Sequence, residues 1–565
     1  MAGSMGSMYI GVSGLQSSQN ALNTTAHNLT NLKTIGYSRQ QVIMNDLSYA
    51  KISQTGAVTN TIGTGTKVEA TKQVRDNFLD ASYRNENGRK NYYLSQYETL
   101  SEVETYFGEL ESNTFSSNLK DLWSTIEEMN NESNSGVTRS AFVETANTFV
   151  ERANQIYDQL VTYQTNLNDK IIDQVDRINE IATKIYDCNK EIIEAEASGV
   201  EEANDYRDAR NALIDELSGL ININVSENID GSVDVYAEGR TLVSQGRTFK
   251  IETQLVSGDS NFLKPVWEGD SDNVFNLDKK PNTEANTDVG SLKGLIMSRG
   301  EDIPNYTDIP EMPVATDYAT TALYDAAMTQ YNSDVETYNN KLEPCGVSNI
   351  IATFDKLTNG ITTTVNDILS PNKKIQLLDG SYINVLDEAK AGIGMGDGND
   401  IQGTELFTRN SVKRYQDPTT VTLADGTTAT VRIYNEESAT NEYSLYNLGN
   451  IQVNGDLLKD PSLLPINSLD GGEYQEITEA LLKAWKDDFS TLNPNTLINN
   501  NFNDFYGALI EDFSNKAYTF DSLAQSQGLT VGEIDAQRQQ VVGVSSDEEL
   551  SNLIKFQHAY NASSR

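Results

Sequence analysis

Cysteine, histidine and proline are scarce in this chain of 565 residues, which argues against cysteine-based sites, histidine-based catalysis and disorder, respectively. The two cysteines, Cys188 and Cys345, lack the spacing of a metal site or a redox pair. We expect two free thiols, with a disulfide between them as the alternative. The two histidines, His27 and His558, are too few for zinc or triad chemistry. With only 11 prolines, the chain is expected to be folded rather than disordered.

Long hydrophobic runs and positive charge are also missing. No apolar run approaches the ~18 residues that a membrane span needs. Residues 1–32 contain no Lys or Arg for the n-region of a signal peptide. The formal net charge of −40 would repel a nucleic acid over most of the surface. We therefore expect no membrane segment, no cleaved signal peptide and no nucleic-acid partner.

Sequence motifs for catalysis or cofactor binding are absent as well. The chain has no HExxH, GxSxG or Walker-type motif. A glycine- and aspartate-rich run at 392–400 fails the EF-hand pattern, because Ile401 stands where an oxygen ligand is required. We interpret this run as a flexible loop, with an irregular calcium site as the alternative. The predictions are no enzymatic activity, no catalytic or metal-binding residue and no cofactor.

The most distinctive feature present is an uncharged helical stripe at each end of the chain. The first 45 residues contain no acidic side chain. Their apolar residues follow the a/d repeat of a supercoiling helix, and a second stripe ends the chain. Because isolated helices of this length are marginal in water, we predict that both ends are mobile alone and buried only in an assembly. The predicted assembly interface comprises Met8, Val12, Leu15, Leu22, Leu29, Leu550, Leu553, Ile554 and Tyr560.

Hydrophobic periodicity divides the rest of the chain. Helical spacing from 87 to 220 gives way to alternation at 221, and Asp-Gly turns at 230–231, 379–380 and 425–426 indicate hairpins. Helical patterns return at 349–369 and from 477 to 540, and 304–340 is predicted as an extended connector followed by a short helix. The predicted fold class is α+β and multidomain, with long terminal and stem helices and inserted β-rich domains. We place a terminal coiled-coil assembly domain at 1–45 plus 541–565, a helical stem at 46–220 plus 291–372 plus 472–540, and β-rich domains at 221–290 and 373–471.

A motif near the N-terminus resembles a known family. Residues 21–31 read ALNTTAHNLTN and residues 35–40 read IGYSRQ. This run resembles the N-terminal motif shared by bacterial flagellar rod, hook and hook-associated proteins. Its asparagines suit caps and turns, and Gly36 suits a positive φ. We expect Asn28, Asn31, Gly36 and Tyr37 to form the turn after the first helix.

Two further stretches are similar to the hook-associated members of this family. They are residues 206–217, which lead into the first β-rich domain, and residues 538–565. The β-rich middle matches only loosely, at 290–295 and 404–407. Because members usually continue for several helical turns beyond the position of Arg565, we expect a shortened C-terminal helix or a truncated chain.

The resemblance implies a structural component of the bacterial flagellum that connects the hook to the filament. Such a subunit is exported unfolded through the flagellar type III apparatus, is extracellular without a cleaved signal peptide, and self-associates in a tubular ring through its terminal helices. The implied partners are the flagellar hook protein, a second hook-associated junction protein, the filament cap protein during growth and a cytosolic export chaperone. The alternatives are another axial subunit of hook, rod or flagellin type, or an axial protein with an enzymatic inserted domain.

Overall fold

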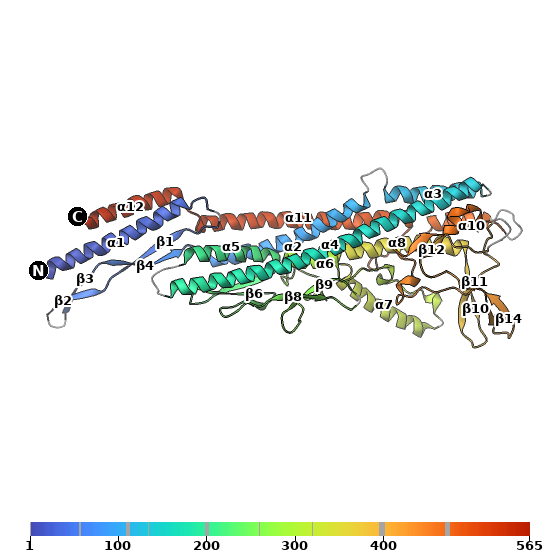
Figure 1. The fold of residues 1–565 in the computed structure, drawn as a ribbon, viewed down its shortest axis with the longest axis horizontal. Helices are drawn as coiled ribbons and strands as arrows, with labels where there is room; N and C mark the ends of the chain where they lie inside the picture. Colours follow the sequence, from blue (N-terminus) through green and yellow to red (C-terminus); the bar gives the residue numbers. More distant parts are fainter. Residues whose placement is uncertain are drawn as a thin grey trace.

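The chain forms an elongated rod with both termini at one tip (Figure 1). This computed structural model describes residues 2–34, 36–55, 58–108, 114–133, 135–197, 203–258, 260–318, 320–394, 402–468 and 475–565. Most of the glycine-rich run that we interpreted as a loop lies outside these residues. Helices from the two ends of the chain pair with each other, and the β-rich segments come between them in sequence. The predicted nested order is therefore confirmed.

Two helices and a β-ribbon make up the tip. Helices α1 (Ala2–Thr30) and α12 (Ser546–Ser564) pack together, which confirms a helix at each end. Antiparallel strand pairs join β1 (Gln40–Asp46) to β4 (Thr66–Gln73), and β2 (Tyr49–Thr55) to β3 (Val58–Gly63). The sequence analysis did not predict these strands, because a segment such as TKVEATKQ in β4 carries no apolar face. They also cross the domain boundary that we placed at residue 45.

The stem pairs helices that are distant in sequence as well as neighbouring ones. Helix α2 (Asn77–Phe107) packs along the distant α11 (Phe502–Val542), and α4 (Gly136–Glu196) packs against its neighbours α3 (Phe115–Asn131) and α5 (Asn204–Leu220). The other stem helices are α6 (Ser291–Arg299), α8 (Gly346–Leu369) and α10 (Gln475–Lys486).

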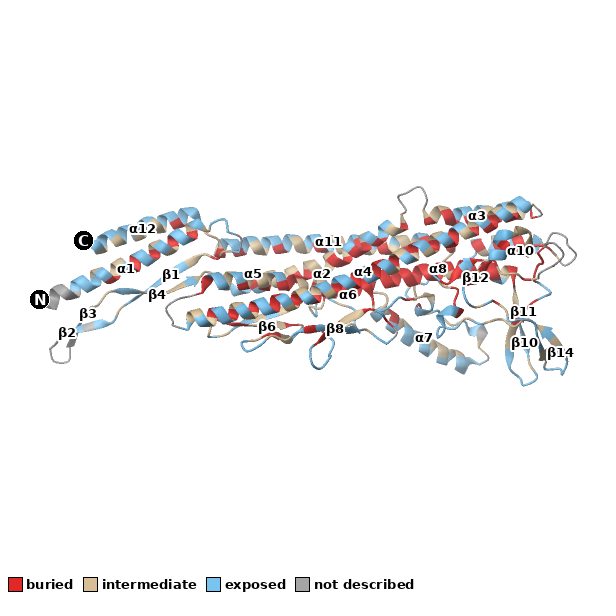
Figure 2. Ribbon diagram, in the orientation of Figure 1, coloured by how far each residue is buried: buried red, intermediate tan, exposed pale blue. Residues whose placement is uncertain are grey.

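One apolar core runs along the stem (Figure 2). The apolar residues of α4 that recur at helical spacing from Phe142 to Ile192 are buried, as predicted. Aromatic rings from four helices then close the core. The Phe115 ring lies 4.9 Å from those of Phe354 and Tyr506, and the Phe107 and Phe354 rings are 5.4 Å apart. Because such ring pairs add to the gain from burial, they fix α2, α3, α8 and α11 against one another.

The first β-rich segment covers one side of α4 and α5. Strands β5 (Ile223–Glu227), β6 (Val233–Ala237) and β7 (Arg240–Val243) form an antiparallel sheet, and β8 (Ile251–Leu255) pairs with β9 (Leu263–Trp267). Gly231 has a φ of 82° in the predicted turn between β5 and β6, which suits glycine because it has no Cβ. Alternate side chains of β6 are buried, so the period-2 pattern from 221 is confirmed.

The second β-rich segment is a group of short hairpins at the far end of the rod. The turn residues Gly380 and Gly426 have φ angles of 85° and 82°, and both predicted turns join paired strands. Its elements are β10 (Asn372–Gln376), β11 (Tyr382–Leu386), β12 (Phe407–Arg409), β13 (Thr419–Thr422), β14 (Thr428–Val431), β15 (Ile451–Val453) and the short helix α9 (Gly455–Lys459). Beyond this segment and after the stem helix α10, β16 (Ser490–Thr491) pairs with β17 (Asn499–Asn500).

The predicted connector is extended and ends in a helix, as expected. It contains the 3₁₀ turns η1 (Tyr306–Asp308) and η2 (Ala315–Asp317) and leads into α7 (Thr321–Lys341). The helix has 21 residues and is longer than predicted, because its many Tyr, Thr and Asp residues hide the apolar period. Short 3₁₀ turns at η3 (Glu442–Ser444) and η4 (Pro461–Leu463) occur farther along.

Membrane-spanning helices and metal-binding clusters are absent from the described part of the chain. Within it, no helix combines the length and the apolar character needed to cross a bilayer. The same residues contain no group of three or more His, Cys, Asp or Glu side chains placed to hold a metal ion.

Glycines allow three segments to approach closely where α2, α5 and α6 meet. A Cβ at Gly294 would lie 2.8 Å from the carbonyl oxygen of Tyr92 and closer still to the hydroxyl of Ser95. A Cβ at Gly290, which has a φ of 93°, would lie 2.8 Å from the backbone of Ile221. Gly290 and Gly294, in the loosely matched run at 290–295, therefore lie at close contacts that leave no room for a side chain.

We expect Gly294→Ala to destabilise the stem by about 1–3 kcal/mol, because the added methyl group meets backbone atoms of α2 that cannot yield. Urea denaturation followed by circular dichroism measures this difference. The matched control is Gly507→Ala in α11, where a Cβ has nothing within 4 Å. That variant should be neutral or more stable by about 0.5–1 kcal/mol, since alanine favours the helix. Equal stability of both variants would contradict the packing argument.

Candidate assembly interface

Helices α1 and α12 pack through a face of small and polar residues. A Cβ at Gly11 would lie 3.2 Å from the carbonyl oxygen of Ser563, and Asn28 contacts Glu549, so the helices run antiparallel. The buried residues of α1 are Ser13, Ser17, Ser18, Ala21, Thr25 and Asn28. Of these, Ser13 and Ser17 bond to Thr66 of β4, and Asn28 contacts Glu549 of α12. Small side chains allow close approach of the helices but bury little apolar area. The pair therefore gains little from the hydrophobic effect.

The predicted apolar stripe is only partly buried in the single chain. Met8 is 72% exposed and Val12 is 52% exposed, and Leu550 and Ile554 of α12 are also exposed. The remaining stripe residues are half-buried, namely Leu15, Leu22, Leu29, Leu553 and Tyr560. The structure thus brings the two terminal helices together and leaves every residue of the stripe at least partly exposed. Apolar side chains stay available on the tip, and their burial in an assembly remains a prediction.

The motif turn fixes α1 through the side chain of Asn28, which is 1% exposed. Its Oδ1 accepts hydrogen bonds from the Tyr37 hydroxyl at 2.7 Å and from the Gln40 N–H at 3.0 Å. Its Nδ2 donates to the Gln40 carbonyl at 2.9 Å and to Glu549 Oε2 at 3.2 Å. A single carboxamide therefore links α1, β1 and α12, which explains why this position requires asparagine.

The other motif residues support the same turn. Burial raises the pKa of the Tyr37 phenol, and the carboxylates of Asp208, Asp205 and Glu549 raise it further, so Tyr37 stays protonated and can donate. Gly36 has a φ of 83° with open space around it, so the backbone conformation is what requires glycine. Asn31 donates to the carbonyl of His27 at 3.1 Å and makes the local turn bond expected of it.

Charged residues tie the turn to α12. Arg39 Nη1 lies 3.0 Å from Glu548 Oε2, and Arg39 Nε lies 3.1 Å from Glu549 Oε1. Its backbone N–H donates to the Val542 carbonyl at 2.9 Å, at the end of α11. Glu549 is buried, so its charge depends on Arg39 and on the amide of Asn28.

A second network ties the turn to the stem. The Ser38 N–H donates to Asp208 Oδ2 of α5 at 3.1 Å, and Arg75 donates to the Ser38 hydroxyl at 3.0 Å. Arg75 also binds both oxygens of Asp80 at 3.0 Å. Arg538 of α11 lies 2.9 Å from Asp80 and 2.7 Å from Asp215. Two carboxylates held by shared guanidinium groups thus join α2, α5 and α11 directly below the tip.

Sequence reasoning assigned no role to the charged members of these networks. Arg39, Asp208, Arg538 and Glu549 lie within the runs that carry the family resemblance, but their partners are hundreds of residues away in sequence. The available signal was the charge of Arg39 in the otherwise uncharged run 35–40, because the other two runs contain several charges each. That signal marks Arg39 but does not reveal its partners.

Comparison with known proteins finds relatives along almost the whole chain. A family profile described as the helical domain of the flagellar hook-associated protein FlgK matches residues 100–312. The flagellar hook-associated protein 1 of Bacillus subtilis (strain 168) is 26% identical, over 98% of this chain and 93% of its own length. Its counterpart of the same name in Escherichia coli (strain K12) is 22% identical, over 98% of this chain and 96% of its own length.

Solved structures match as well, among them that of the flagellar hook junction protein FlgK from Burkholderia pseudomallei. The match has a TM-score of 0.47 and 12% sequence identity, and it covers 83% of this chain and all of that one. The region matched by the family profile begins within α2 and ends after α6. It therefore contains the greater part of the stem and the first β-rich segment.

We expect Asn28→Ala to loosen the tip without unfolding the stem. The substitution leaves the Gln40 backbone and the Tyr37 hydroxyl without their partner, at about 1–3 kcal/mol for each buried group left unpaired. Hydrogen exchange measured by mass spectrometry should be faster in peptides from α1 and α12 and unchanged in α4. The control is Asn31→Ala, whose bonds are confined to its own turn. Equal exchange in the two variants would argue against Asn28 as the link.

We expect Asp80 to contribute to the acid sensitivity of the protein. Burial alone would raise its pKa, but Arg75, Arg84 and Arg538 outweigh burial and hold the pKa below its ordinary value. The stability it contributes is therefore present above about pH 4, the unfolded-state pKa, and is lost as the pH falls through the lower folded-state pKa. Asp80→Asn should lower the free energy of unfolding by about 3 kcal/mol at pH 7, because the guanidinium groups lose a buried charged partner. It should also flatten the decline of this free energy below pH 4, because the substituted side chain does not titrate.

Urea denaturation between pH 2.5 and pH 7 measures this dependence. The control, Asp173→Asn, changes an exposed acid of α4 and should reproduce the wild-type profile. A profile for Asp80→Asn that runs parallel to wild type throughout would show that Asp80 does not titrate with folding.

Proposed function

We infer that this chain is a flagellar hook-associated protein, because relatives named flagellar hook-associated protein 1 align with nearly its whole length and with nearly all of theirs. Its role is that of a structural subunit at the junction between the hook and the filament of the bacterial flagellum. This full-length similarity is the observation that carries the junction role. The profile match to the helical stem supports it independently.

The tip supplies the surface for assembly. Its exposed apolar residues Met8 and Val12 lie on α1, which bears no acidic residue, in a chain of net charge −40. A neighbouring copy that packs against these residues buries apolar area at about 25 cal/mol per Å² without burying an unpaired charge. Self-association in a tubular ring through the terminal helices therefore places the uncharged α1 helices together at the core. The acidic stems and hairpins face outward.

The partners follow from a position at the junction. The hook protein lies below the ring and a second hook-associated junction protein lies above it, with the filament cap protein present during growth. The chain reaches this site outside the cell through the flagellar type III apparatus, without a cleaved signal peptide, and a cytosolic chaperone holds it before export. Cys188 and Cys345 pass the exporter as thiols, and the structure has both as free cysteines.

The inserted β-rich segments are structural rather than catalytic in this proposal. Their buried polar groups, such as Arg414 and Glu405, contact one another and the backbone. Arg414 donates to the Ser370 carbonyl at 3.2 Å, and the Tyr446 hydroxyl donates to Glu405 at 2.6 Å. These contacts hold the hairpins on the end of α8.

We expect Leu22→Glu to prevent assembly while leaving the isolated protein folded. Leu22 is half-buried at the centre of the stripe, and a glutamate enclosed there in the ring has no partner, at a cost of several kcal/mol per subunit interface. Cells with this variant should release filament protein into the medium and swim poorly. The purified variant should melt close to wild type.

The matched control is Leu378→Glu, which places the same charge on an exposed leucine in a hairpin far from the tip. Those cells should swim normally. Motile cells with normal filaments and Leu22→Glu in place would refute the stripe as an assembly surface.

A further inference from the structure

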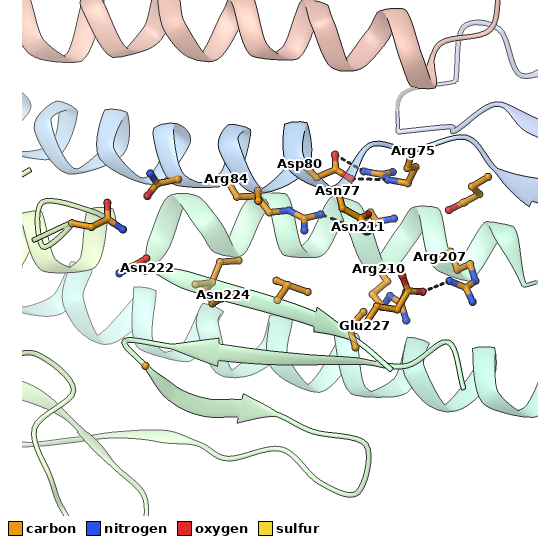
Figure 3. Close-up of a pocket in the computed structure, with 18 of the residues that line it drawn as sticks. Arg75, Asn77, Asp80, Arg84, Arg207, Arg210, Asn211, Asn222, Asn224 and Glu227 are labelled. Atoms are coloured by element: carbon orange, nitrogen blue, oxygen red, sulfur yellow. Dashed lines mark hydrogen bonds and ion pairs between the residues drawn. The ribbon is translucent and has the colours of Figure 1, made fainter. Parts of the chain in front are cut away.

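A polar cleft of about 800 Å³ lies where the stem meets the first β-rich segment. Figure 3 shows its walls, which come from the start of α2, from α5 and from the β5–β6 hairpin. Its lining includes two acidic side chains, Asp80 and Glu227, and five basic ones, Lys72, Arg75, Arg84, Arg207 and Arg210. In a chain of net charge −40, an excess of positive charge in one cleft favours an anionic ligand.

Three of the four arginines already hold a carboxylate of the chain. Arg75 binds Asp80 through two bonds of 3.0 Å, and Arg84 Nε donates to Asp215 at 2.7 Å. Arg207 binds both oxygens of Glu196 at 2.8 Å and Glu227 at 2.6 Å. Three arginines of the cleft therefore bind carboxylates in the side-on geometry that a guanidinium group provides.

Arg210 is the exception among these arginines. Its Nη1 donates to Asn189 Oδ1 at 2.9 Å and to the Gly231 carbonyl at 2.7 Å, but its buried Nε has no hydrogen-bond partner within the described residues. The side chain is only 3% exposed, and its ion pair is with Glu227 at 3.9 Å, a carboxylate already held by Arg207. Burial and the neighbouring Arg207 lower the pKa of Arg210 to about 10, as expected for a buried cation that lacks a close counter-charge.

Neutral donors complete the lining. Asn77, Asn211, Asn222 and Asn224 place carboxamide groups around the cationic centre (Figure 3). Lys72, also of the lining, is exposed. Amide N–H and ammonium groups bind carboxylate oxygens without adding negative charge. The four carboxamides thus add N–H donors to those of the basic side chains in the lining.

We propose that this cleft binds carboxylates, and that acidic side chains of a neighbouring copy of the chain supply them in the assembly. The assignment to a neighbour rests on the proposed function; the assignment to carboxylates does not. Copies packed side by side bring strongly acidic surfaces together, and like charges repel unless cations lie between them. A cleft with spare guanidinium and amide donors, close to the tip, relieves that repulsion at the contact.

The test is isothermal titration calorimetry on the full chain at constant ionic strength, with two probes. Citrate reports on carboxylate chemistry alone, and an acetylated, amidated hexaglutamate reports on an acidic protein segment. Both should bind saturably, one per chain, and compete with each other. Lys72→Glu and Asn224→Asp each bring negative charge to an exposed position of the lining and should weaken both probes at least tenfold.

The control is Lys170→Glu, which makes the same charge change on the exposed face of α4. It should bind both probes like wild type, and circular dichroism should show all variants folded. Absence of saturable binding, or unchanged binding by Lys72→Glu and Asn224→Asp, would overturn the site. Binding of citrate without hexaglutamate would overturn the neighbouring copy as the source. Because the isolated chain is titrated, none of these results depends on whether it acts at a flagellar junction.

Discussion

The orientation of the tip depends on one buried carboxamide. Asn28 presents a donor and an acceptor on the same side chain, so it can satisfy the Gln40 backbone, the Tyr37 hydroxyl and the Glu549 carboxylate together. A carboxylate would supply no donor at that point, and an aliphatic side chain would supply neither. The ion pairs of Arg39 and Arg538 extend this contact to α12 and the stem. The position of both chain ends thus depends on polar groups with exact partners.

The tip and the stem are held together by different forces. The stem buries apolar stripes and a cluster of aromatic rings, so its stability comes from burial and packing. The tip buries mainly serine, alanine, threonine and asparagine between its helices and leaves its larger apolar side chains exposed. The helix pair of the tip is therefore expected to open at a lower free energy than the stem. This division suits a subunit whose ends must meet neighbours while its body stays unchanged.

Periodicity predicted the elements that bury an apolar face, and it missed those that do not. The stripe of α4 and the Asp-Gly turns at Gly231, Gly380 and Gly426 were predicted from spacing and turn chemistry alone. The strands at 40–73 were missed because the apolar residues of β1 (Val42, Ile43 and Met44) are consecutive and those of β4 are few, so neither strand shows the alternation of a half-buried strand. For α1 the helix was predicted but not its packing face, since the small residues and the apolar stripe both repeat at helical spacing. The contact between Asn28 and Glu549 could not be predicted from the sequence, because the two residues are 521 positions apart.

That separation also determines the order of folding. Closing a loop costs more entropy as it lengthens, and the pairing of α1 with α12 closes nearly the whole chain. Contacts between neighbouring segments, such as those of α3 with α4 and of α1 with β1 and β4, are local and form first, whereas the contact of α1 with α12 needs the last helix. The packing of the two terminal helices is therefore expected to be among the last contacts to form. A chain that emerges from its N-terminal side keeps one face of α1 uncovered until Ser546–Ser564 has arrived.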